Sequence, residues 1–370
     1  MKKKNKSQQS VRKLQPTIVG SGLLALDVVV SDSSHEKAQY FAGGTCGNVL
    51  TILSYLGWHA KPIGRLKDDI PVEWLVEDLS KWGVDCSLVT RTQDGSTPVI
   101  IQYIRESHSG ERTHTFSLRC PCCGAYLPGY KSILGTAADE YALSLGSRQV
   151  FFFDRVSRGT LNLARASAES GALVVFEPSG VGEPRLFREA WSIAHVVKYS
   201  NDRLRDIADL DLGESERNGV LLEIETLGAR GLRYRSRLEK VPSKAWKTMK
   251  VIPAESVIDA AGSGDWCTAG IIHKLSRGGL TGFRKVTSDR LVDALRYGQA
   301  LATWNCGFEG ARGGMYNLTK AQFERQIRSL LMGKSIHRPT IDPQIAPGDI
   351  IRLCPSCEST NSSRMRPTAG

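Results

Sequence analysis

Short apolar runs alternate with segments of helical periodicity from residue 149 onward, and this alternation restricts the possible folds more than any other feature of the chain. The runs predicted to be strands are Gln149 to Phe153, Leu173 to Phe176, Val196 to Tyr199, Val220 to Glu225 and Leu232 to Arg235. Strands that alternate with helices form a parallel sheet covered by helices on both faces. We therefore expect an α/β fold with a central, mostly parallel sheet.

The composition is that of an ordinary globular protein. Of the 370 residues, 41% are hydrophobic and 24% are charged, and a chain of this length can bury a substantial core. No apolar run approaches the roughly 20 residues that span a bilayer. The basic start, Lys2 to Lys6, lacks the apolar segment of a secretory signal. We expect a cytoplasmic protein without a membrane segment.

The net charge of +11 raises the question of a nucleic-acid partner. Much of the excess lies near the termini, and residues 1–14 are expected to form a basic, disordered tail. Such a tail more often remains solvated than binds a partner. Nucleic-acid binding is therefore the weakest functional hypothesis, because it rests on charge alone.

A Gly-Ser-Gly turn leads into a helix at Asp259-Ala260-Ala261-Gly262-Ser263-Gly264-Asp265. The glycines allow successive N–H groups to point to one place, and the helix start adds unpaired N–H groups and the positive end of its dipole. This predicts a phosphate pocket with Asp265 at its rim, placed to accept a proton from a hydroxyl. The alternative is an ordinary loop in which Asp265 only caps the helix.

Two features near the N-terminus predict a ligand site. Asp27 interrupts an apolar run just after a first strand, where a carboxylate is costly to bury without partners; an edge-strand position is the alternative. Further on, Gly43 and Gly44 precede Asn48 and a helix that is expected to end at Gly57. The glycines let the backbone approach a ligand closely, and Asn48 can both donate and accept hydrogen bonds.

These stretches resemble the two signatures of the ribokinase-like (PfkB) carbohydrate kinases, Gly-Gly-x-x-x-Asn and Asp-Thr-x-Gly-Ala-Gly-Asp. The resemblance covers roughly residues 16 to 325 and implies a Rossmann-like ribokinase fold with a small β-sheet lid. It also implies ATP-dependent phosphorylation of a hydroxyl on a sugar or nucleoside, with Asp265 as the base. The implied anion hole is Gly262, Ser263 and Gly264, and the implied acceptor site is Asp27, Gly43, Gly44 and Asn48.

The resemblance extends to the nucleotide side. The segment Glu225-Thr226-Leu227-Gly228-Ala229-Arg230-Gly231 resembles the family's Thr-x-Gly-x-x-Gly segment, and Gln299 to Cys306 matches the helix beside the adenine pocket. The implied nucleotide-binding residues are Asn201, Thr226, Gly228, Gly231 and Asp259. ATP and Mg²⁺ are the implied cofactors, with a monovalent cation as a further candidate.

The kinase domain is expected over residues 15–330, with lid strands within about 27–42 and 96–118. Thr97 to Ile104 and Thr113 to Leu118 are predicted to pair as a hairpin. Exposed lid edges can pair with another sheet, which makes a homodimer one option. Three aromatic side chains are candidates for stacking on a nucleoside base, with core packing as the alternative: Trp58, Tyr103 and Phe116.

Three departures from the family pattern indicate a divergent member. The glutamate of the usual Asn-x-x-Glu is missing after Asn201, where Asp202 is the available acid. Glu177-Pro178-Ser179-Gly180-Val181 stands where Asp-Pro-Asn-x-Arg is usual, and Ala260 or Ala261 replaces the signature threonine. The alternative to a kinase is therefore a catalytically weakened relative that binds a nucleotide or nucleoside as a regulator.

Nine cysteines, an odd number, exclude a complete internal set of disulfides. Two Cys-x-x-Cys segments could point four thiolates at one metal. We predict a structural zinc ion on Cys120, Cys123, Cys354 and Cys357, which would fasten the C-terminal tail, residues 331–370, to the strand after the lid. The alternatives are two unrelated pairs or a redox couple.

Overall fold

The computed structural model describes residues 15–31, 38–106, 112–204, 210, 212–336 and 350–357. The predicted basic tail, residues 1–14, and the turn of the predicted hairpin lie outside the described residues. So does most of the predicted C-terminal tail.

A nine-stranded sheet forms the body of the described chain, in the order β13-β12-β11-β10-β9-β8-β1-β4-β5. Neighbouring strands from β11 to β5 are parallel, as the alternating pattern predicts. The strands are β1 (Thr17–Ser21), β4 (His59–Lys67), β5 (Val89–Thr92), β8 (Val150–Phe153), β9 (Leu173–Phe176), β10 (Val196–Ser200), β11 (Leu222–Thr226), β12 (Leu232–Ser236) and β13 (Ser243–Met249).

The edge formed by β12 and β13 differs from the sequence prediction. We expected Leu232 to Arg235 to continue the parallel alternation, but β12 runs antiparallel to β11 and to β13. The reason is the short connection, a 3₁₀ turn η4 (Gly228–Arg230) between β11 and β12. A parallel return needs a crossover of a dozen or more residues, whereas a short turn reverses the chain.

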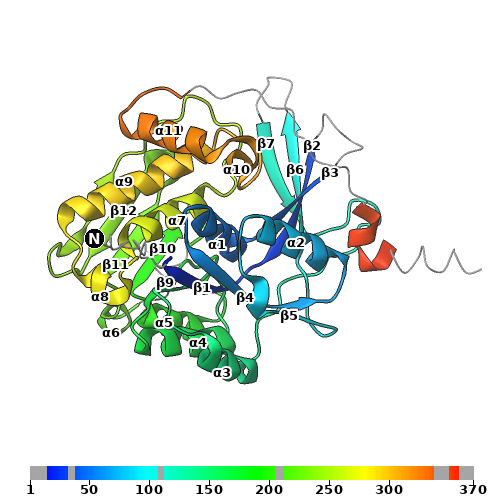
Figure 1. The fold of residues 1–370 in the computed structure, drawn as a ribbon, viewed down its shortest axis with the longest axis horizontal. Helices are drawn as coiled ribbons and strands as arrows, with labels where there is room; N and C mark the ends of the chain where they lie inside the picture. The colour runs from blue at the N-terminus through cyan, green and yellow to red at the C-terminus, as the bar shows by residue number, and fades with distance from the viewer. Residues whose placement is uncertain are drawn as a thin grey trace, which may run out of the picture.

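Helices cover both faces of the sheet (Figure 1). Alternate residues of β8 face opposite sides: Val150 and Phe152 belong to one buried core, and Phe151 and Phe153 to the other. The first core is covered by α1 (Thr45–Tyr55), α2 (Ile70–Lys81), α7 (Ser263–Leu275), α8 (Gly279–Arg284), α9 (Ser288–Asn305), α10 (Gly313–Asn317) and α11 (Lys320–Leu331). The second is covered by α3 (Gly135–Ser144), α4 (Arg158–Glu169) and α5 (Pro184–Ile193), and α6 (Glu214–Arg217) lies against α5.

A second, four-stranded sheet projects from one side of the body (Figure 1). We call it the lid sheet; its order is β3-β2-β6-β7, with β2 (Ala25–Ser31), β3 (Ala38–Gly43), β6 (Val99–Glu106) and β7 (Arg112–Ser117). Strands β6 and β7 pair antiparallel, as the predicted hairpin requires. Because side chains alternate between faces, Asp27 and its pairing partner Phe41 share one face, while Leu26 and Val28 lie on the other.

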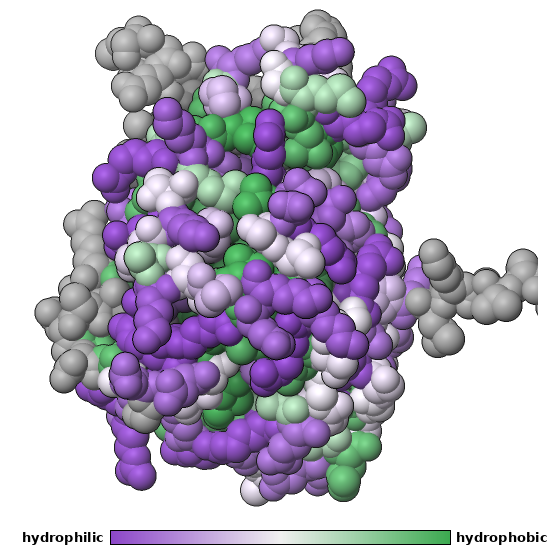
Figure 2. Space-filling view, turned by 90° about the vertical axis from the view of Figure 1, so that its left-hand side faces the viewer, coloured by the Kyte–Doolittle hydropathy of each residue, from purple (hydrophilic) through white to green (hydrophobic). Residues whose placement is uncertain are grey.

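The side of the molecule near α8 and α9 carries mainly polar side chains, with apolar ones scattered between them (Figure 2). Within the described ranges, no helix combines the length and apolar character needed to cross a bilayer.

Candidate active site

Polar residues follow four adjacent parallel strands at the edge where these strands end. Asp154 follows β8, Glu177 follows β9, Asn201 follows β10, and Thr226 is the last residue of β11. Parallel strands bring their carboxyl ends to the same edge, and open α/β sheets bind ligands there. The candidate site is therefore at this edge, beneath the lid sheet.

The start of α7 contains the turn at which the sequence predicts an anion pocket. Gly262 caps the helix at φ +71°, and a Cβ there would overlap the backbone of Ala311, so the turn requires glycine. The N–H of Ser263 donates to the Ala260 carbonyl at 3.2 Å. Helix geometry leaves the N–H groups of the first turn without partners inside the helix, so those of Gly264 and Asp265 are positioned to hold an anion.

Asp259 holds this turn in place. Its carboxylate accepts hydrogen bonds from the backbone N–H groups of Ala261 (2.7 Å) and Gly310 (2.8 Å), and from Nε2 of Gln102 on the lid sheet (3.2 Å). Asn305 of α9 adds a bond from Nδ2 to the Ala261 carbonyl at 2.9 Å. Asp259 thus joins the α7 turn, the loop after α9 and the lid sheet.

The predicted base, Asp265, lies in the first turn of α7 and is 9% exposed. Its Oδ2 accepts a hydrogen bond from Nδ2 of Asn48 on α1 at 2.7 Å. Burial and the charge of Glu177 raise the pKa of Asp265 to about 7, against the opposing effects of Asn48, Arg203 and Lys198. A carboxylate with this pKa can accept a proton near neutral pH.

A buried charge network beside Asp265 was missed from the sequence. Nζ of Lys198 on β10 lies 2.6 Å from Oε1 of Glu177, and Thr268 of α7 donates to Oε2 of Glu177 at 2.5 Å. Lys198 is 2% exposed. Burial acts to lower its pKa, but the charges of Glu177, Cys267 and Asp265 raise it overall, so this lysine keeps its positive charge.

The acceptor residues predicted from the sequence meet where the lid sheet joins the body. A Cβ at Gly43 would overlap the carboxylate of Asp27, and Gly44 adopts φ +77° against the Leu23 carbonyl. Burial raises the pKa of Asp27 to about 7, against the opposing charge of Arg312. Asn48 is buried, and its Oδ1 has no hydrogen-bond partner among the described residues.

Arg312 is a second residue that the sequence analysis missed. It is 2% exposed and its Nη2 donates to the Ala42 carbonyl and, at 2.8 Å, to Oδ2 of Asp78 on α2. Tyr316 donates to the same carboxylate oxygen at 2.7 Å. These bonds join the loop after α9 to the lid strand β3, and they place a positive charge near Asp27.

The predicted nucleotide residues lie along the next part of the edge. The backbone N–H of Asn201 donates to the Thr226 carbonyl at 3.1 Å, so the two strand ends are joined. Gly228 and Gly231 flank the turn after β11 at φ +58° and +96°, and a Cβ at Gly231 would overlap the Met249 carbonyl. Glycine is therefore needed at position 231 for the close approach of β13.

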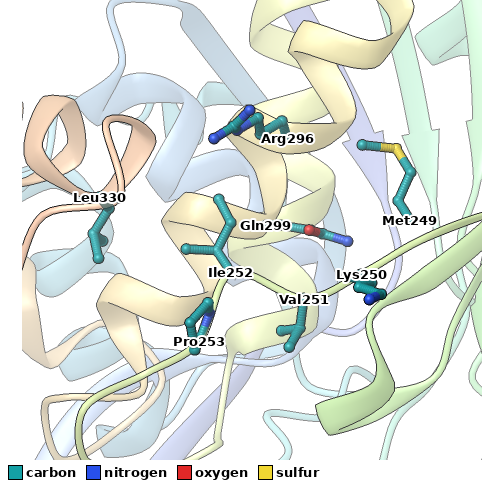
Figure 3. Close-up of a pocket in the computed structure, with 9 residues that line it drawn as sticks. Met249, Lys250, Val251, Ile252, Pro253, Arg296, Gln299 and Leu330 are labelled. Atoms are coloured by element: carbon teal, nitrogen blue, oxygen red, sulfur yellow. The ribbon is translucent and has the colours of Figure 1, made fainter.

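A cavity of about 320 Å³ lies between the segment after β13 and helices α9 and α11. Figure 3 shows Gln299 projecting from α9 toward Lys250, Val251 and Ile252. Gln299 is 6% exposed, yet its Nε2 has no hydrogen-bond partner in the described part of the chain. A buried amide without a partner is costly, and a ligand in this cavity would supply one.

One departure from the family pattern lies in the turn after β10. Asp202, the proposed substitute for the missing glutamate, is exposed in the turn after β10. Its neighbour Arg203, also exposed, is close enough to lower the pKa of Asp265 through its charge. The charge of an arginine therefore acts on Asp265, although this arginine comes from a different segment than the usual pattern provides.

The three aromatic candidates lie in different places. Trp58 is buried in the main core and donates from Nε1 to His273 at 3.3 Å, so it packs rather than stacks on a ligand. Tyr103 packs on the lid face opposite Asp27. Phe116 pairs with Gln102 across β6 and β7 and is 65% exposed, so it lies on the face of the lid sheet that also carries Asp27.

The four predicted metal ligands lie together. The sulfur atoms of Cys120, Cys123, Cys354 and Cys357 are within 4.8 Å of one another, at the lid face opposite Asp27.

A parallel α/β sheet with a buried carboxylate in the first turn of a helix at its carboxyl edge is compatible with a phosphotransferase. A model of the pfkB family carbohydrate kinases matches residues 22–317. The chain belongs to the pfkB family of carbohydrate kinases, and it is a phosphotransferase that uses an alcohol group as acceptor.

Individual relatives are distant. A ketohexokinase from Mus musculus is 24% identical over 323 residues, which are 79% of this chain and 96% of that protein. A probable fructokinase-4 from Arabidopsis thaliana is 24% identical over 345 residues, 85% of this chain and 97% of that protein.

Among solved structures, the Arabidopsis thaliana ribokinase complexed with ribose and ATP has a TM-score of 0.62 at 18% identity, covering 86% of this chain and 99% of that one. A Burkholderia thailandensis nucleoside kinase in complex with inosine has a TM-score of 0.61 at 17% identity, covering 85% and 97%. These similarities confirm the predicted fold.

Proposed function

We propose that this kinase transfers the γ-phosphoryl group of ATP to a hydroxyl of a sugar or nucleoside, with Asp265 as the general base. The observation that carries the proposal is the position of Asp265, which lies in the first turn of α7 and is held by Asn48 at 2.7 Å. The same turn supplies the N–H groups of the anion pocket. Proton acceptor and phosphoryl site are thus adjacent.

In the proposed reaction, Asp265 takes the hydroxyl proton as the acceptor oxygen bonds to the γ-phosphorus and the bond to the ADP oxygen breaks. The amides of Gly264 and Asp265 hold the transferring group, and Arg203 adds positive charge near it. Phosphoryl transfer depends mainly on positioning and charge stabilisation. The lid sheet, bonded to the α7 turn through Gln102 and Asp259, would exclude water from this step.

The acceptor would lie between Asp27 and Asn48. The carboxylate of Asp27 can accept hydrogen bonds from hydroxyls, and the unpartnered Oδ1 of Asn48 can accept another. Gly43 leaves room for the Asp27 carboxylate, which a Cβ at position 43 would overlap, and Gly44 allows the backbone of Leu23 to approach closely. The acceptor hydroxyl would then reach Asp265, because Asn48 would contact the acceptor through Oδ1 and already donates to Asp265 through Nδ2.

For the nucleotide, we propose that the base occupies the cavity beside Gln299 in Figure 3, where the unpartnered Nε2 would donate to a ring nitrogen. The phosphates would run past Thr226, Gly228 and Gly231 toward the α7 turn. We propose that Asp259 acts by positioning this turn, since its carboxylate accepts hydrogen bonds from two backbone N–H groups of the loops.

Magnesium fits the edge near Asn201. The Oδ1 of Asn201 is buried and lacks a hydrogen-bond partner among the described residues, and carboxamide oxygens and their bound waters suit a hard cation. Asn201, with the ATP phosphates, would hold Mg²⁺, which neutralises charge on the phosphates. Glu177 is less available, because both its oxygens are used by Lys198 and Thr268.

The direct test is ATP consumption against a panel of ketohexoses, other hexoses, pentoses and nucleosides. Ketohexoses come first, because the names of the sequence relatives favour them. Asp265→Asn should lower kcat by about 10²–10⁴-fold, the usual contribution of a general base. Asp139→Asn, an exposed carboxylate on α3, is the matched control and should keep full activity. Wild-type turnover in Asp265→Asn would contradict the proposal.

A further inference from the structure

Four cysteine sulfurs from two distant Cys-x-x-Cys segments converge on one point at the lid sheet. Cys120 and Cys357 have their Sγ atoms 3.8 Å apart, and those of Cys123 and Cys354 are 3.6 Å apart. All four lie within 4.8 Å of one another, although 237 and 231 positions separate the paired residues.

The spacing of the sulfur atoms fits a metal tetrahedron rather than disulfides. A disulfide requires sulfurs about 2.05 Å apart. Four thiolates at about 2.3 Å from a zinc ion would be separated by edges of about 3.8 Å, which agrees with the two observed separations. Four soft thiolates favour zinc. A complete set of four protein ligands leaves no open position, so the site is structural rather than catalytic.

The first cysteine segment is already shaped as a metal-binding turn. The N–H of Cys120 donates to the Ala125 carbonyl at 2.8 Å, and the N–H of Gly124 donates to the Cys120 carbonyl at 2.9 Å, with Gly124 at φ +73°. The N–H of Cys122 points to the Cys120 sulfur at 3.4 Å and would stabilise a thiolate there. The Cys122 side chain is exposed and is not a member of the cluster.

The second segment covers an apolar face. Leu353, at the end of the 3₁₀ helix η5 (Ile350–Leu353), and Cys354 are 1% and 0% exposed. They pack with the outer lid cluster, which consists of Leu26, Val28, Ala38, Val99, Ile101, Cys120 and Leu127. Figure 1 shows this segment in red beside α2 and the lid sheet. Residues 350–357 are too few to form a stable structure of their own. Their position on the lid sheet therefore requires an additional link to the lid.

We propose that Cys120, Cys123, Cys354 and Cys357 bind one structural zinc ion that fastens residues 350–357 across the outer face of the lid sheet. This site is separate from the proposed phosphoryl transfer, because it lies on the lid face opposite Asp27. Zinc binding would stabilise the native lid, since a ligand that binds only the folded state stabilises it. Loss of the metal would uncover the outer lid cluster.

The test uses the full chain, expressed with zinc in the medium and purified without chelators. Elemental analysis should give about one zinc per chain. Cys354→Ser and Cys357→Ser should lose most of this zinc, whereas Cys122→Ser, the matched neighbour outside the cluster, should keep it. Replacement by Co²⁺ should produce the visible bands of tetrahedral cobalt and the charge-transfer bands of cobalt–thiolate bonds in the wild type and in Cys122→Ser.

A further readout covers the case in which the serine variants fail to fold. A mercurial reagent that titrates thiols should release zinc from the folded wild type, detected with a chromogenic chelator, and Cys122→Ser should release the same amount. Wild-type protein without zinc, iron in its place, disulfides between the four cysteines under non-reducing conditions, or unchanged zinc in Cys354→Ser would each overturn the proposal.

Discussion

Asn48 on α1 donates a hydrogen bond from Nδ2 to Oδ2 of Asp265 on α7 at 2.7 Å, across 217 positions of the chain. The bond joins the N-terminal glycine segment, where the acceptor is proposed to bind, to the C-terminal turn that is proposed to form the anion pocket. Because the Oδ1 of Asn48 remains without a partner among the described residues, one side chain can orient both the base and the hydroxyl that the base deprotonates.

Asn48→Ala should shift the pH dependence of catalysis to higher pH. The Asn48 hydrogen bond lowers the pKa of Asp265, so its removal should raise that pKa above about 7. The acceptor KM should also rise, because Oδ1 is lost. Profiles of kcat/KM against pH measure the pKa shift, and saturation curves with the acceptor at a fixed pH measure its KM. Thr51→Val removes another buried polar group from α1 and should leave the profile in place; an equal shift in both variants would argue against the assigned bond.

The wild-type enzyme should lose activity as the pH falls below neutral. A base must be ionised to accept a proton, and burial raises the pKa of Asp265 to about 7, so kcat/KM should fall below that pH and level off above it. The pKa of Asp27 is raised to about 7 as well. The logarithmic profile should therefore be steeper than for one ionisation, and Asp27→Asn should reduce it to a single ionisation. A flat profile between pH 5 and 8 would exclude both assignments.

Lys198→Met should destabilise the protein by roughly 3–5 kcal/mol, because it leaves the carboxylate of Glu177 buried without its ion partner. Urea unfolding measures the loss. The double variant Lys198→Met with Glu177→Gln should recover part of it, since the charge of Glu177 is then removed together with that of its ion partner. Lys198 lowers the pKa of Asp265 and Glu177 raises it, so the two single variants should shift the pH profile in opposite directions. If Lys198→Met and Glu177→Gln shifted the pH profile in the same direction, the assigned charge network around Asp265 would be wrong.

The local parts of this site were predictable from the sequence. The α7 turn follows from the Gly-Ser-Gly sequence directly before Asp265, and the parallel strands follow from apolar runs separated by helices. The lid hairpin followed from two strand-rich runs. Each of these signals lies within a short window of the chain, where backbone freedom and side-chain periodicity determine the outcome.

The missed parts depend on contacts between distant elements. Lys198, Glu177 and Thr268 come from β10, the end of β9 and α7, and 91 positions separate Glu177 from Thr268. The signal was a single lysine inside an apolar strand, which a buried strand accepts only with an ion partner. Arg312 and Asp78 are 234 positions apart, and no local pattern marks either one. The prediction of a parallel β12 was wrong because the turn at Gly228 is too short for the crossover that a parallel strand needs.

Arg203→Gln should lower kcat more than it raises either KM, because the Arg203 charge, which acts on Asp265, is proposed to lie near the transferring group and to act most strongly as negative charge is redistributed. It should also raise the pKa of Asp265, since Arg203 lowers it. Arg185→Gln, an exposed arginine at the start of α5, controls for the change in net charge. If both variants alter kcat alike, the effect is a general one of surface charge.

Gly43→Ala tests the acceptor site with a single methyl group. A Cβ at this position would overlap the carboxylate of Asp27, whereas the backbone of Gly43 is not in the left-handed region that only glycine accepts readily. The fold should therefore persist while Asp27 is displaced.

The acceptor KM of Gly43→Ala should rise by about tenfold or more, since a hydrogen bond to a charged group contributes about 1.5–3 kcal/mol. The KM for ATP should stay constant, because the nucleotide is proposed to lie beside Gln299 on α9. Gly129→Ala, whose Cβ would meet open space, is the control and should match the wild type in both constants. An unchanged acceptor KM in Gly43→Ala would place the acceptor elsewhere; an increase in the KM for ATP alone would assign this end of the lid sheet to the nucleotide.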